Sequence, residues 1–174
     1  MSRLLHVLIV EDSEDDALLL VRELHKGGFD IDYLRVDDEQ MLRSALDDHS
    51  WDIVITDHNM PALSSDISIL SVKQTGRDIP VIIVSGSIGE EVAVNAMKSG
   101  AHDYIMKGNL SRLVPAIERE LREAENRRAH REAEHKIHYM AHHDALTGVI
   151  NRYGFEERLN ELLSLSGQDI RHGF

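Results

Sequence analysis

Four short apolar runs in this 174-residue sequence are each followed at once by a side chain that can bind a metal ion or a phosphate. Glu11-Asp12 follow LLHVLIV, Asp57 follows DIVIT, Ser85 follows PVIIV and Lys107 follows DYIM. Clustered carboxylates repel one another, so three in one place need a cation or raised pKa values. Mg²⁺ suits oxygen ligands and keeps waters that a phosphate can displace, and a carboxylate beside it can attack phosphorus. A hydroxyl and an ammonium can hold the phosphoryl oxygens, so the set predicts phosphoryl chemistry if the fold brings these positions together.

The spacing of apolar residues predicts alternating strands and helices over the first 110 residues. We expect strands at 4–10, 31–36, 52–56, 79–84 and 103–106, and helices at 13–26, 38–48, 65–75 and 90–99. Strands this apolar, separated by helices, indicate a parallel sheet covered on both faces, and right-handed crossovers make a doubly wound α/β fold the simplest topology. Such sheets bind ligands outside the carboxyl ends of their strands, so the predicted residues should share one crevice.

Residues between these elements favour helix starts and ends. Ser13 and Asp37 are the expected N-caps, while Glu14, Asp15 and Asp16 are acids that suit the positive end of the first helix. The expected helix ends are followed by glycines, which adopt left-handed conformations easily: Gly27-Gly28, Gly76 and Gly100.

A long helix is expected after the last strand, because no proline or glycine interrupts residues 116–144. Its apolar stripe gives way to arginines and histidines, and two such helices could pair as a coiled coil that supports a homodimer. His135, His138 and His142 share one helical face and could in principle bind Zn²⁺; the alternative is a polar seam on a signalling helix.

The composition limits the class of protein. A hydrophobic fraction of 42% suits a buried core, and the absence of cysteine suits a reducing cytoplasm. Most of the net charge of −12 lies in the first 110 residues, which disfavours direct binding of nucleic acid. LLHVLIV is too short to cross a bilayer and lacks a cleavage site, so neither a membrane anchor nor a signal peptide is expected.

The motifs VLIVEDSEDD, DIVITDHNMP, PVIIVSGS and DYIMKG, in this order, resemble the receiver domain of bacterial two-component response regulators. The resemblance covers about residues 3–123 and implies a flavodoxin-like five-stranded sheet of order 2-1-3-4-5. It implies that Asp57 accepts a phosphoryl group from a phosphohistidine on a sensor histidine kinase or a phosphotransfer protein. It also implies that Mg²⁺ is bound by Glu11, Asp12, Asp57 and the main-chain carbonyl of Asn59. By the same resemblance Ser85 and Lys107 hold the phosphoryl group, and rotation of Tyr104 reports it.

Two positions near the expected site depart from this family or lack a role. Gly108 follows the lysine where most receivers have proline, which leaves the geometry of that loop less constrained. His58 is most simply an exposed histidine. A haloacid-dehalogenase-like phosphatase also uses a strand-end aspartate nucleophile, but that family has a second aspartate where Asn59 stands. SGSIGEE is not a P-loop, because no Gly-Lys-Ser/Thr follows it.

The segment HHDALTGVINRYGF resembles the opening of a diguanylate cyclase (GGDEF) domain. The matching residues are Asp144, Leu146, Thr147, Gly148, Asn151, Arg152 and Phe155. The GG(D/E)EF loop of that family lies further along, so this chain is not expected to cyclise GTP. The resemblance implies a parent protein that makes cyclic di-GMP, in a family where an EAL phosphodiesterase domain often follows.

We therefore expect a receiver at 1–123, a helical or coiled-coil linker at 124–142 and the start of a GGDEF domain at 143–174. The expected function is a cytoplasmic receiver that switches a cyclase through phosphorylation of Asp57. The alternative is a docking or dimerisation module in which Asp57 is rarely phosphorylated.

Overall fold

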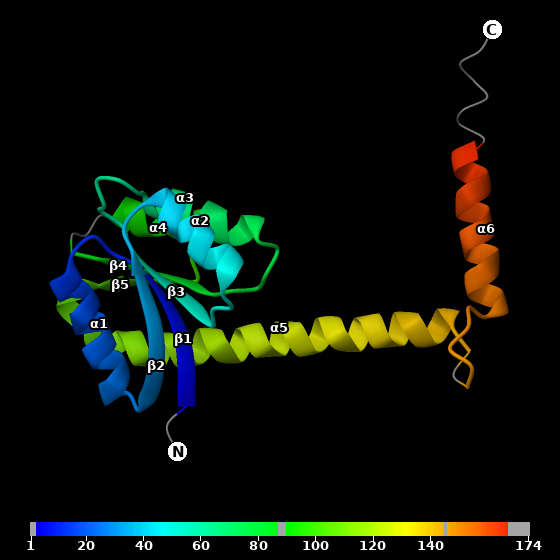
Figure 1. Ribbon diagram of the computed structural model, residues 1–174, viewed down its shortest axis with the longest axis horizontal. Helices are drawn as coiled ribbons and strands as arrows, with labels where there is room; N and C mark the ends of the chain where they lie inside the picture. Colours follow the sequence, from blue (N-terminus) through cyan, green and yellow to red (C-terminus); the bar gives the residue numbers. More distant parts are fainter. Residues whose placement is uncertain (1–2, 87–89, 145, 167–174) are drawn as a thin grey trace, which may run out of the picture. The chain divides into compact units, whose positions relative to one another are not determined.

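The computed structural model describes residues 3–86, 90–144 and 146–166. They divide into two compact units that meet in sequence between Glu125 and Asn126. The first unit alternates strands and helices in the order β1 Arg3–Val10, α1 Glu14–Lys26, β2 Phe29–Val36, α2 Glu39–Asp48, β3 Ile53–Asp57, α3 Ser65–Gln74, β4 Val81–Ser85, α4 Glu90–Ser99 and β5 Asp103–Met106 (Figure 1). A 3-10 helix (η1, Lys107–Arg112), α5 (Leu113–His142) and α6 (Arg152–Ser166) follow. Residues 87–89 of the SGSIGEE segment and residues 167–174 of the expected third region lie outside the described residues.

The five strands form one parallel sheet of order β2-β1-β3-β4-β5, which confirms the predicted doubly wound, flavodoxin-like topology. Its register aligns the carboxyl ends of the central strands. Val10 pairs with Thr56, so the next residues, Glu11 and Asp57, lie level with each other. Ser85 pairs with Met106, so Lys107 emerges beside the end of β4.

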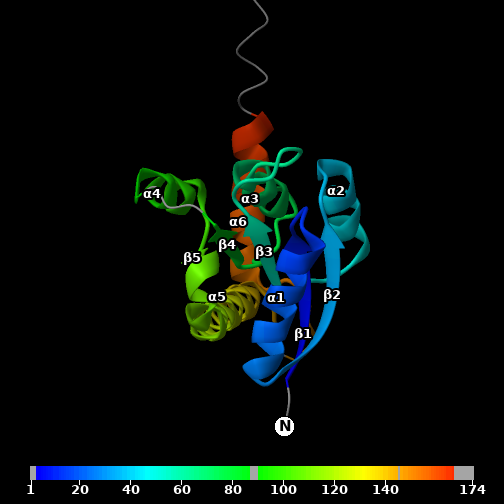
Figure 2. The same cartoon turned by 90° about the vertical axis from the view of Figure 1, so that its left-hand side faces the viewer.

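The hydrophobic core has one part on each face of the sheet, because successive strand residues point to opposite faces. On one face Leu5 and Ile9 of β1 pack with α1 and the first turns of α5. On the other face Leu8 and Val10 of the same strand pack with residues of α2, α3 and α4 (Figure 2). The apolar runs of the central strands β1, β3 and β4 are therefore buried from both sides, whereas the edge strand β2 is largely exposed.

The predicted helix starts are right at one cap and wrong at the other. Ser13 caps α1, and its hydroxyl accepts the Asp16 N–H at 3.3 Å. The cap of α2 is Asp38 and not Asp37: Asp38 Oδ1 accepts the Met41 N–H at 2.7 Å. The side chain of Asp37 instead accepts a hydrogen bond from Arg35 at 3.1 Å. The extended backbone continues after β2 through Asp38, so the cap falls one residue later than predicted.

The glycines after the helices act in two ways. Gly28, Gly76 and Gly100 have φ of 86°, 67° and 110°, which confirms the expected left-handed positions. Gly27 has φ of −73° and does not need that freedom. It is instead in close contact with α5, since a Cβ at this position would lie 2.5 Å from Val114 Cγ2.

We expect Gly27→Ala to lower the free energy of unfolding by about 1–2 kcal/mol, because the added methyl overpacks against Val114. Urea denaturation followed by circular dichroism measures this. The double variant Gly27→Ala, Val114→Ala removes the clash and should recover most of the loss relative to Val114→Ala alone. An equal loss in both backgrounds would show that the close approach of α1 and α5 is not the cause.

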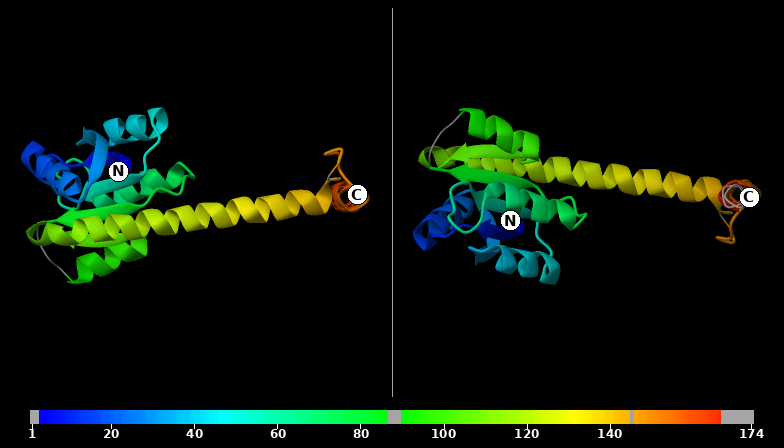
Figure 3. Two further views of the ribbon diagram at one scale, coloured as in Figure 1. Left: turned by 90° about the horizontal axis from the view of Figure 1, so that it is seen from below. Right: turned by 90° about the horizontal axis from the view of Figure 1, so that it is seen from above.

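The predicted long helix is α5, which runs unbroken over 30 residues (Figure 3). Leu113, Ile117, Leu121 and Ala124 are buried in the first unit. Beyond them the helix has no buried residue among those described. No helix in the described part of the chain is both long and apolar enough to cross a membrane.

Candidate functional site

Three carboxylates meet at the carboxyl edge of the sheet. Glu11 and Asp12 follow β1 and Asp57 ends β3, and one oxygen from each lies within 4.8 Å of the others. Glu11 and Asp57 are 1% and 7% exposed, whereas Asp12 lies on the surface. Among the described residues, these three acids are the set of at least three acidic, histidine or cysteine side chains that lie close enough to bind one metal ion. The cluster is thus all-oxygen, buried at its base and open at Asp12.

Burial makes the negative charge of Glu11 costly and raises the pKa of its carboxyl group. Hydrogen bonds oppose this effect: Lys107 donates to Oε2 at 2.8 Å and the Ser13 N–H donates to Oε1 at 3.2 Å. The nearby charge of Asp57 raises the pKa further. Burial thus raises the pKa of Glu11, and Lys107 is the largest influence that opposes this rise.

Lys107 contacts side chains from three elements: the carboxyl ends of β1 and β3 and the first turn of α1. Its ammonium donates to Glu11 at 2.8 Å and to Asp57 Oδ2 at 2.9 Å, and it makes an ion pair with Asp16 of α1. Burial works against the charged ammonium, but the hydrogen bonds to Asp16, Glu11 and Asp57 outweigh it, so the pKa of Lys107 is raised. The lysine is permanently charged at the pH of a cell.

Both carboxylate oxygens of Asp57 have hydrogen-bond partners. Oδ2 accepts from Lys107, and Oδ1 accepts the main-chain N–H of Asn59 at 3.1 Å. Asn59 itself forms an isolated bridge with Ser64, just before α3. These contacts hold the Asp57 carboxylate in one orientation at the carboxyl edge of the sheet.

Two other predicted residues, Ser85 and Tyr104, lie on β4 and β5. Ser85 is fully buried at the end of β4. A Cβ on the next residue, Gly86, would lie 3.9 Å from Lys107 Cδ, so the lysine side chain passes over this strand end. Tyr104 is a half-buried residue of β5 that packs against the core on the α2–α4 face.

Sequence reasoning missed one member of the site and misjudged another. The sequence predicts only that Asp16 suits the positive end of α1, yet its carboxylate contacts Lys107. His58 is not the exposed histidine that we expected: it is half-buried, and its Nδ1 lies 2.8 Å from the hydroxyl of the buried Ser65. The one available signal for Asp16 was its place in the first turn after a strand that ends in acids.

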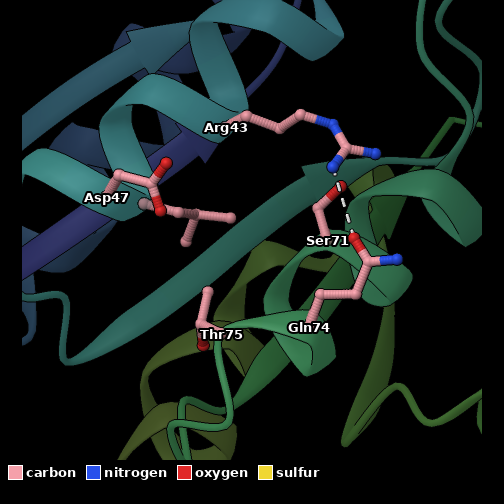
Figure 4. A pocket seen from close by; sticks show the side chains of 6 residues that line it. Arg43, Asp47, Ser71, Gln74 and Thr75 are labelled. Atoms are coloured by element: carbon pink, nitrogen blue, oxygen red, sulfur yellow. Dashed lines mark hydrogen bonds between the residues drawn. The ribbon is translucent and has the colours of Figure 1, made fainter.

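A second depression lies between α2 and α3, away from the strand ends (Figure 4). Arg43 of α2 reaches over it to Gln74 of α3, to which it donates a hydrogen bond at 3.3 Å. The hydroxyl of Ser71 is buried there without a partner among the described residues. A volume of about 140 Å³ holds a few waters and none of the strand-end residues, so it is not the candidate site.

The residues of the C-terminal motif build a turn between α5 and α6. Asp144 Oδ1 accepts hydrogen bonds from the N–H groups of Leu146 and Thr147 at 3.1 and 3.0 Å, and from the Thr147 hydroxyl at 2.9 Å. These bonds lower the pKa of Asp144. Gly148 has φ of 67°, which suits glycine at this turn.

The side chain of Asn151 makes hydrogen bonds to both helices that flank this turn. Its side-chain N–H donates to Ala141 O at 2.9 Å, and its side-chain oxygen accepts the Gly154 N–H at 2.9 Å. A Cβ on Gly154 would lie 2.7 Å from the carbonyl oxygen of His142, so a larger residue would force the turn apart. By contrast Leu146 is 95% exposed, and the Arg152 side chain is 92% exposed with an ion pair to Glu156.

The linker histidines do not form a zinc site among the described residues, since the group close enough to share a metal is the acidic cluster at the sheet edge. His142 is instead engaged at both nitrogens. Nδ1 faces the His138 carbonyl at 2.7 Å and Nε2 faces the Glu157 carboxylate at 2.6 Å. Its ring stacks on that of His138, with 4.1 Å between centroids.

We expect the pKa of His142 to lie above the usual value of about 6.5 for histidine, because the His138 carbonyl and the Glu157 carboxylate both favour its charged form. A histidine pKa that is raised by folding stabilises the turn at low pH, and this stability is lost as the pH rises through the raised value. An NMR titration of the ring measures it. Glu157→Gln should lower the pKa of His142, whereas Glu156→Gln, which removes the partner of Arg152, should not. Equal titration in both variants would contradict the assignment.

Comparison with known proteins shows what this arrangement is similar to. The family model for the response regulator receiver domain matches residues 7–118. A protein-glutamate methylesterase/protein-glutamine glutaminase 2 from Caulobacter vibrioides is 34% identical over 111 residues, which cover 63% of this chain and 32% of that protein. The transcriptional regulatory protein FixJ from Bradyrhizobium diazoefficiens is 31% identical over 121 residues, which cover 69% of this chain and 58% of that protein.

The chain therefore spans less than two thirds of the length of these two curated relatives. Among solved structures, a response regulator receiver domain protein from Clostridium thermocellum aligns with a TM-score of 0.61 and 27% identity. That alignment covers 70% of this chain and 97% of the other. The residues that match the family model, 7–118, lie within the first unit and include the acidic cluster and Lys107.

Proposed function

The chain belongs to the response regulator receiver family, and we propose that it is a switch in which Asp57 accepts a phosphoryl group from a phosphohistidine of a sensor kinase or phosphotransfer protein. One observation supports this most strongly. The Asp57 carboxylate lies at the carboxyl edge of the sheet, oriented by Lys107 and by the Asn59 N–H, with two further carboxylates beside it.

The proposed reaction is a displacement at phosphorus. A carboxylate oxygen of Asp57 forms the new P–O bond as the P–N bond of the donor histidine breaks, and the bonding electrons return to the imidazole. Lys107 then donates to a phosphoryl oxygen and offsets its charge. The transfer turns a carboxylate with one negative charge into an acyl phosphate with about two, so a cationic surrounding is required.

The residues present fit the Mg²⁺ that we propose for this site. Glu11, Asp12 and Asp57 offer oxygen atoms within 4.8 Å of one another, and the exposed side at Asp12 leaves room for water and phosphate. The main-chain carbonyl of Asn59 is the fourth proposed ligand. When bound, the ion would shield the carboxylates from the incoming phosphoryl group. We propose that Ser85 binds a phosphoryl oxygen and that Tyr104 changes its position on β5 in response.

Mass spectrometry of the intact chain after incubation with acetyl phosphate and Mg²⁺ tests this function. One phosphoryl adduct per chain is the expected result. The absence of any adduct would favour the docking or dimerisation module. Continued release of inorganic phosphate over many turnovers would favour a phosphatase instead.

For the output, we propose that residues 143–174 begin a diguanylate cyclase domain, after a receiver at 1–123 and a linker at 124–142. Two features support this. The motif residues Asp144, Thr147 and Asn151 form a defined turn, and α6 presents apolar side chains to solvent, with Phe155, Leu159 and Leu162 exposed by 58%, 45% and 60%. A helix with such a stripe requires a partner surface.

Under this proposal phosphorylation of Asp57 changes how two copies of the chain pair through the linker helix or a receiver face, so that two catalytic domains can meet. The parent protein, supplied with GTP and Mg²⁺, should form cyclic di-GMP at a rate that depends on Asp57. A parent that lacks cyclase activity in both phosphorylation states would refute the output assignment and leave the receiver assignment intact.

A further inference from the structure

Asp16 is a fourth carboxylate at the phosphorylation site, and neither the motif comparison nor the metal cluster accounts for it. It lies in the first turn of α1 and makes an ion pair with Lys107 Nζ. The same ammonium also binds Glu11 and Asp57, so one positive charge is shared by three carboxylates.

The local sequence offers Asp16 a different partner. Ser13 and Asp16 have the spacing of a capping box, in which the acid of the third helical residue accepts the N–H of the cap. Here that N–H is donated to Glu11 Oε1 at 3.2 Å, while the Ser13 hydroxyl accepts the Asp16 N–H at 3.3 Å. Because Glu11 takes the N–H of Ser13, the Asp16 side chain is released from the cap and reaches Lys107.

The three partners of Lys107 differ in how easily water can replace it. The Glu11 and Asp57 side chains are 1% and 8% exposed, and each would be left as a buried charge. The Asp16 side chain is 35% exposed and can be solvated when the ammonium leaves. Breaking an exposed ion pair costs little, whereas stripping a buried carboxylate of its partner costs several times more.

We propose that the ion pair between Asp16 and Lys107 is present in the unphosphorylated chain and breaks when a phosphoryl group forms on Asp57. This inference rests on the proposed function. Asp16 competes with the phosphoryl oxygens for the only ammonium in direct contact with Asp57 in the described structure, and its own charge repels the new phosphate. Asp16 therefore slows phosphorylation and shortens the life of the phosphorylated form, acting as a positioning residue through Lys107.

The test compares Asp16→Asn with Asp15→Asn at saturating Mg²⁺ and with acetyl phosphate as the donor. Asp15 is exposed in the same helical turn, so its variant removes an equal charge without touching Lys107. Asp16→Asn should raise the first-order rate of phosphoryl uptake about threefold to fivefold and lengthen the half-life of the adduct by a similar factor. Asp15→Asn should change each by less than about twofold. Equal behaviour of the two variants, or slower uptake in Asp16→Asn, would overturn the proposal.

A second measurement does not need phosphorylation. Urea denaturation without Mg²⁺ gives a double-mutant cycle for Asp16→Asn and Lys107→Met. Asp16→Asn should shift the unfolding equilibrium about threefold more in the chain that keeps Lys107 than in the chain that lacks it. If the effect of Asp16→Asn is the same with and without Lys107, that result alone overturns the inference. A wild-type chain that takes up no phosphoryl group overturns the proposed function and the inference with it. A chain that is phosphorylated but shows no effect of Asp16 overturns the inference alone.

Discussion

Replacing Asp57 with asparagine is expected to abolish phosphorylation of the chain, with a loss of more than about 100-fold in the rate of uptake from acetyl phosphate. An amide cannot attack phosphorus as a carboxylate does, and no neighbouring acid has the same position. Glu11 is almost fully buried, and its carboxylate oxygens face Lys107 and the Ser13 N–H. Intact-mass spectrometry measures the adduct directly.

The fold should survive this substitution. Asparagine keeps the volume of the side chain, can still accept the Asn59 N–H and removes one of the charges that repel Glu11. The urea midpoint should therefore be unchanged or slightly higher at neutral pH. Asp47→Asn, at an exposed position of α2, is the matched control and should be phosphorylated normally. Full labelling of the Asp57→Asn chain would identify a different acceptor and defeat the proposed mechanism.

Removal of the Lys107 ammonium is expected to affect stability as well as chemistry. Lys107→Met keeps the length of the side chain but leaves the carboxylates of Glu11 and Asp57 buried without their cation. Breaking a buried pair on one side is strongly destabilising, so we expect the free energy of unfolding to fall by about 2–4 kcal/mol at neutral pH. Lys98→Met, on the exposed surface of α4, should change it by less than about 0.5 kcal/mol.

The loss in Lys107→Met should depend on pH in a defined direction. Burial raises the pKa of Glu11 in the folded chain. A carboxyl group with a raised pKa binds its proton more tightly in the folded state, so stability falls as the pH rises from the unfolded value to the folded one. Without Lys107 this cost increases, and protonation of Glu11 at low pH should recover part of the loss.

Urea midpoints of wild type and Lys107→Met at about pH 5 and about pH 7.5 test this expectation, since a raised pKa makes Glu11 more protonated at the lower pH. The gap between the two chains should be smaller at the lower pH. Added Mg²⁺ should also narrow it at the higher pH, because the proposed cation would replace the missing charge. A gap that is the same under all three conditions would show that Lys107 acts by packing and not by charge.

Much of the fold was predictable because its signals are local. The apolar runs and the helices between them indicated a parallel sheet, and β5 and α4 have the predicted bounds, Asp103–Met106 and Glu90–Ser99. β2 begins at Phe29, two residues before the predicted start. The reason is its pairing with β1, in which Phe29 and Asp30 lie opposite Arg3 and Leu4, and a strand end that alternates in exposure carries no clear apolar pattern.

The candidate site followed from the same local signals and one general rule. Parallel strands end at a common edge, so their positions in the sequence predict that Glu11, Asp57 and Lys107 lie together. Chain position alone could not show that the Asp57 carboxylate is held by both Lys107 and the Asn59 N–H. It also could not show that His58 turns to the hydroxyl of Ser65.

The sequence by itself determined the alternation of strands and helices, the edge at which the polar residues gather and the chemistry that their types allow. Only the tertiary structure decided which acid each cation meets. Asp16 has a local partner available in the cap of its own helix, and its actual partner, Lys107, lies 91 positions away. The choice depends on Glu11 taking the Ser13 N–H at the end of β1. The spacing of apolar residues shows which side of each segment faces the core. It cannot show that the Ser13 N–H and the Lys107 ammonium compete for Asp16, because that competition requires the ends of β1 and β5 to lie beside the start of α1.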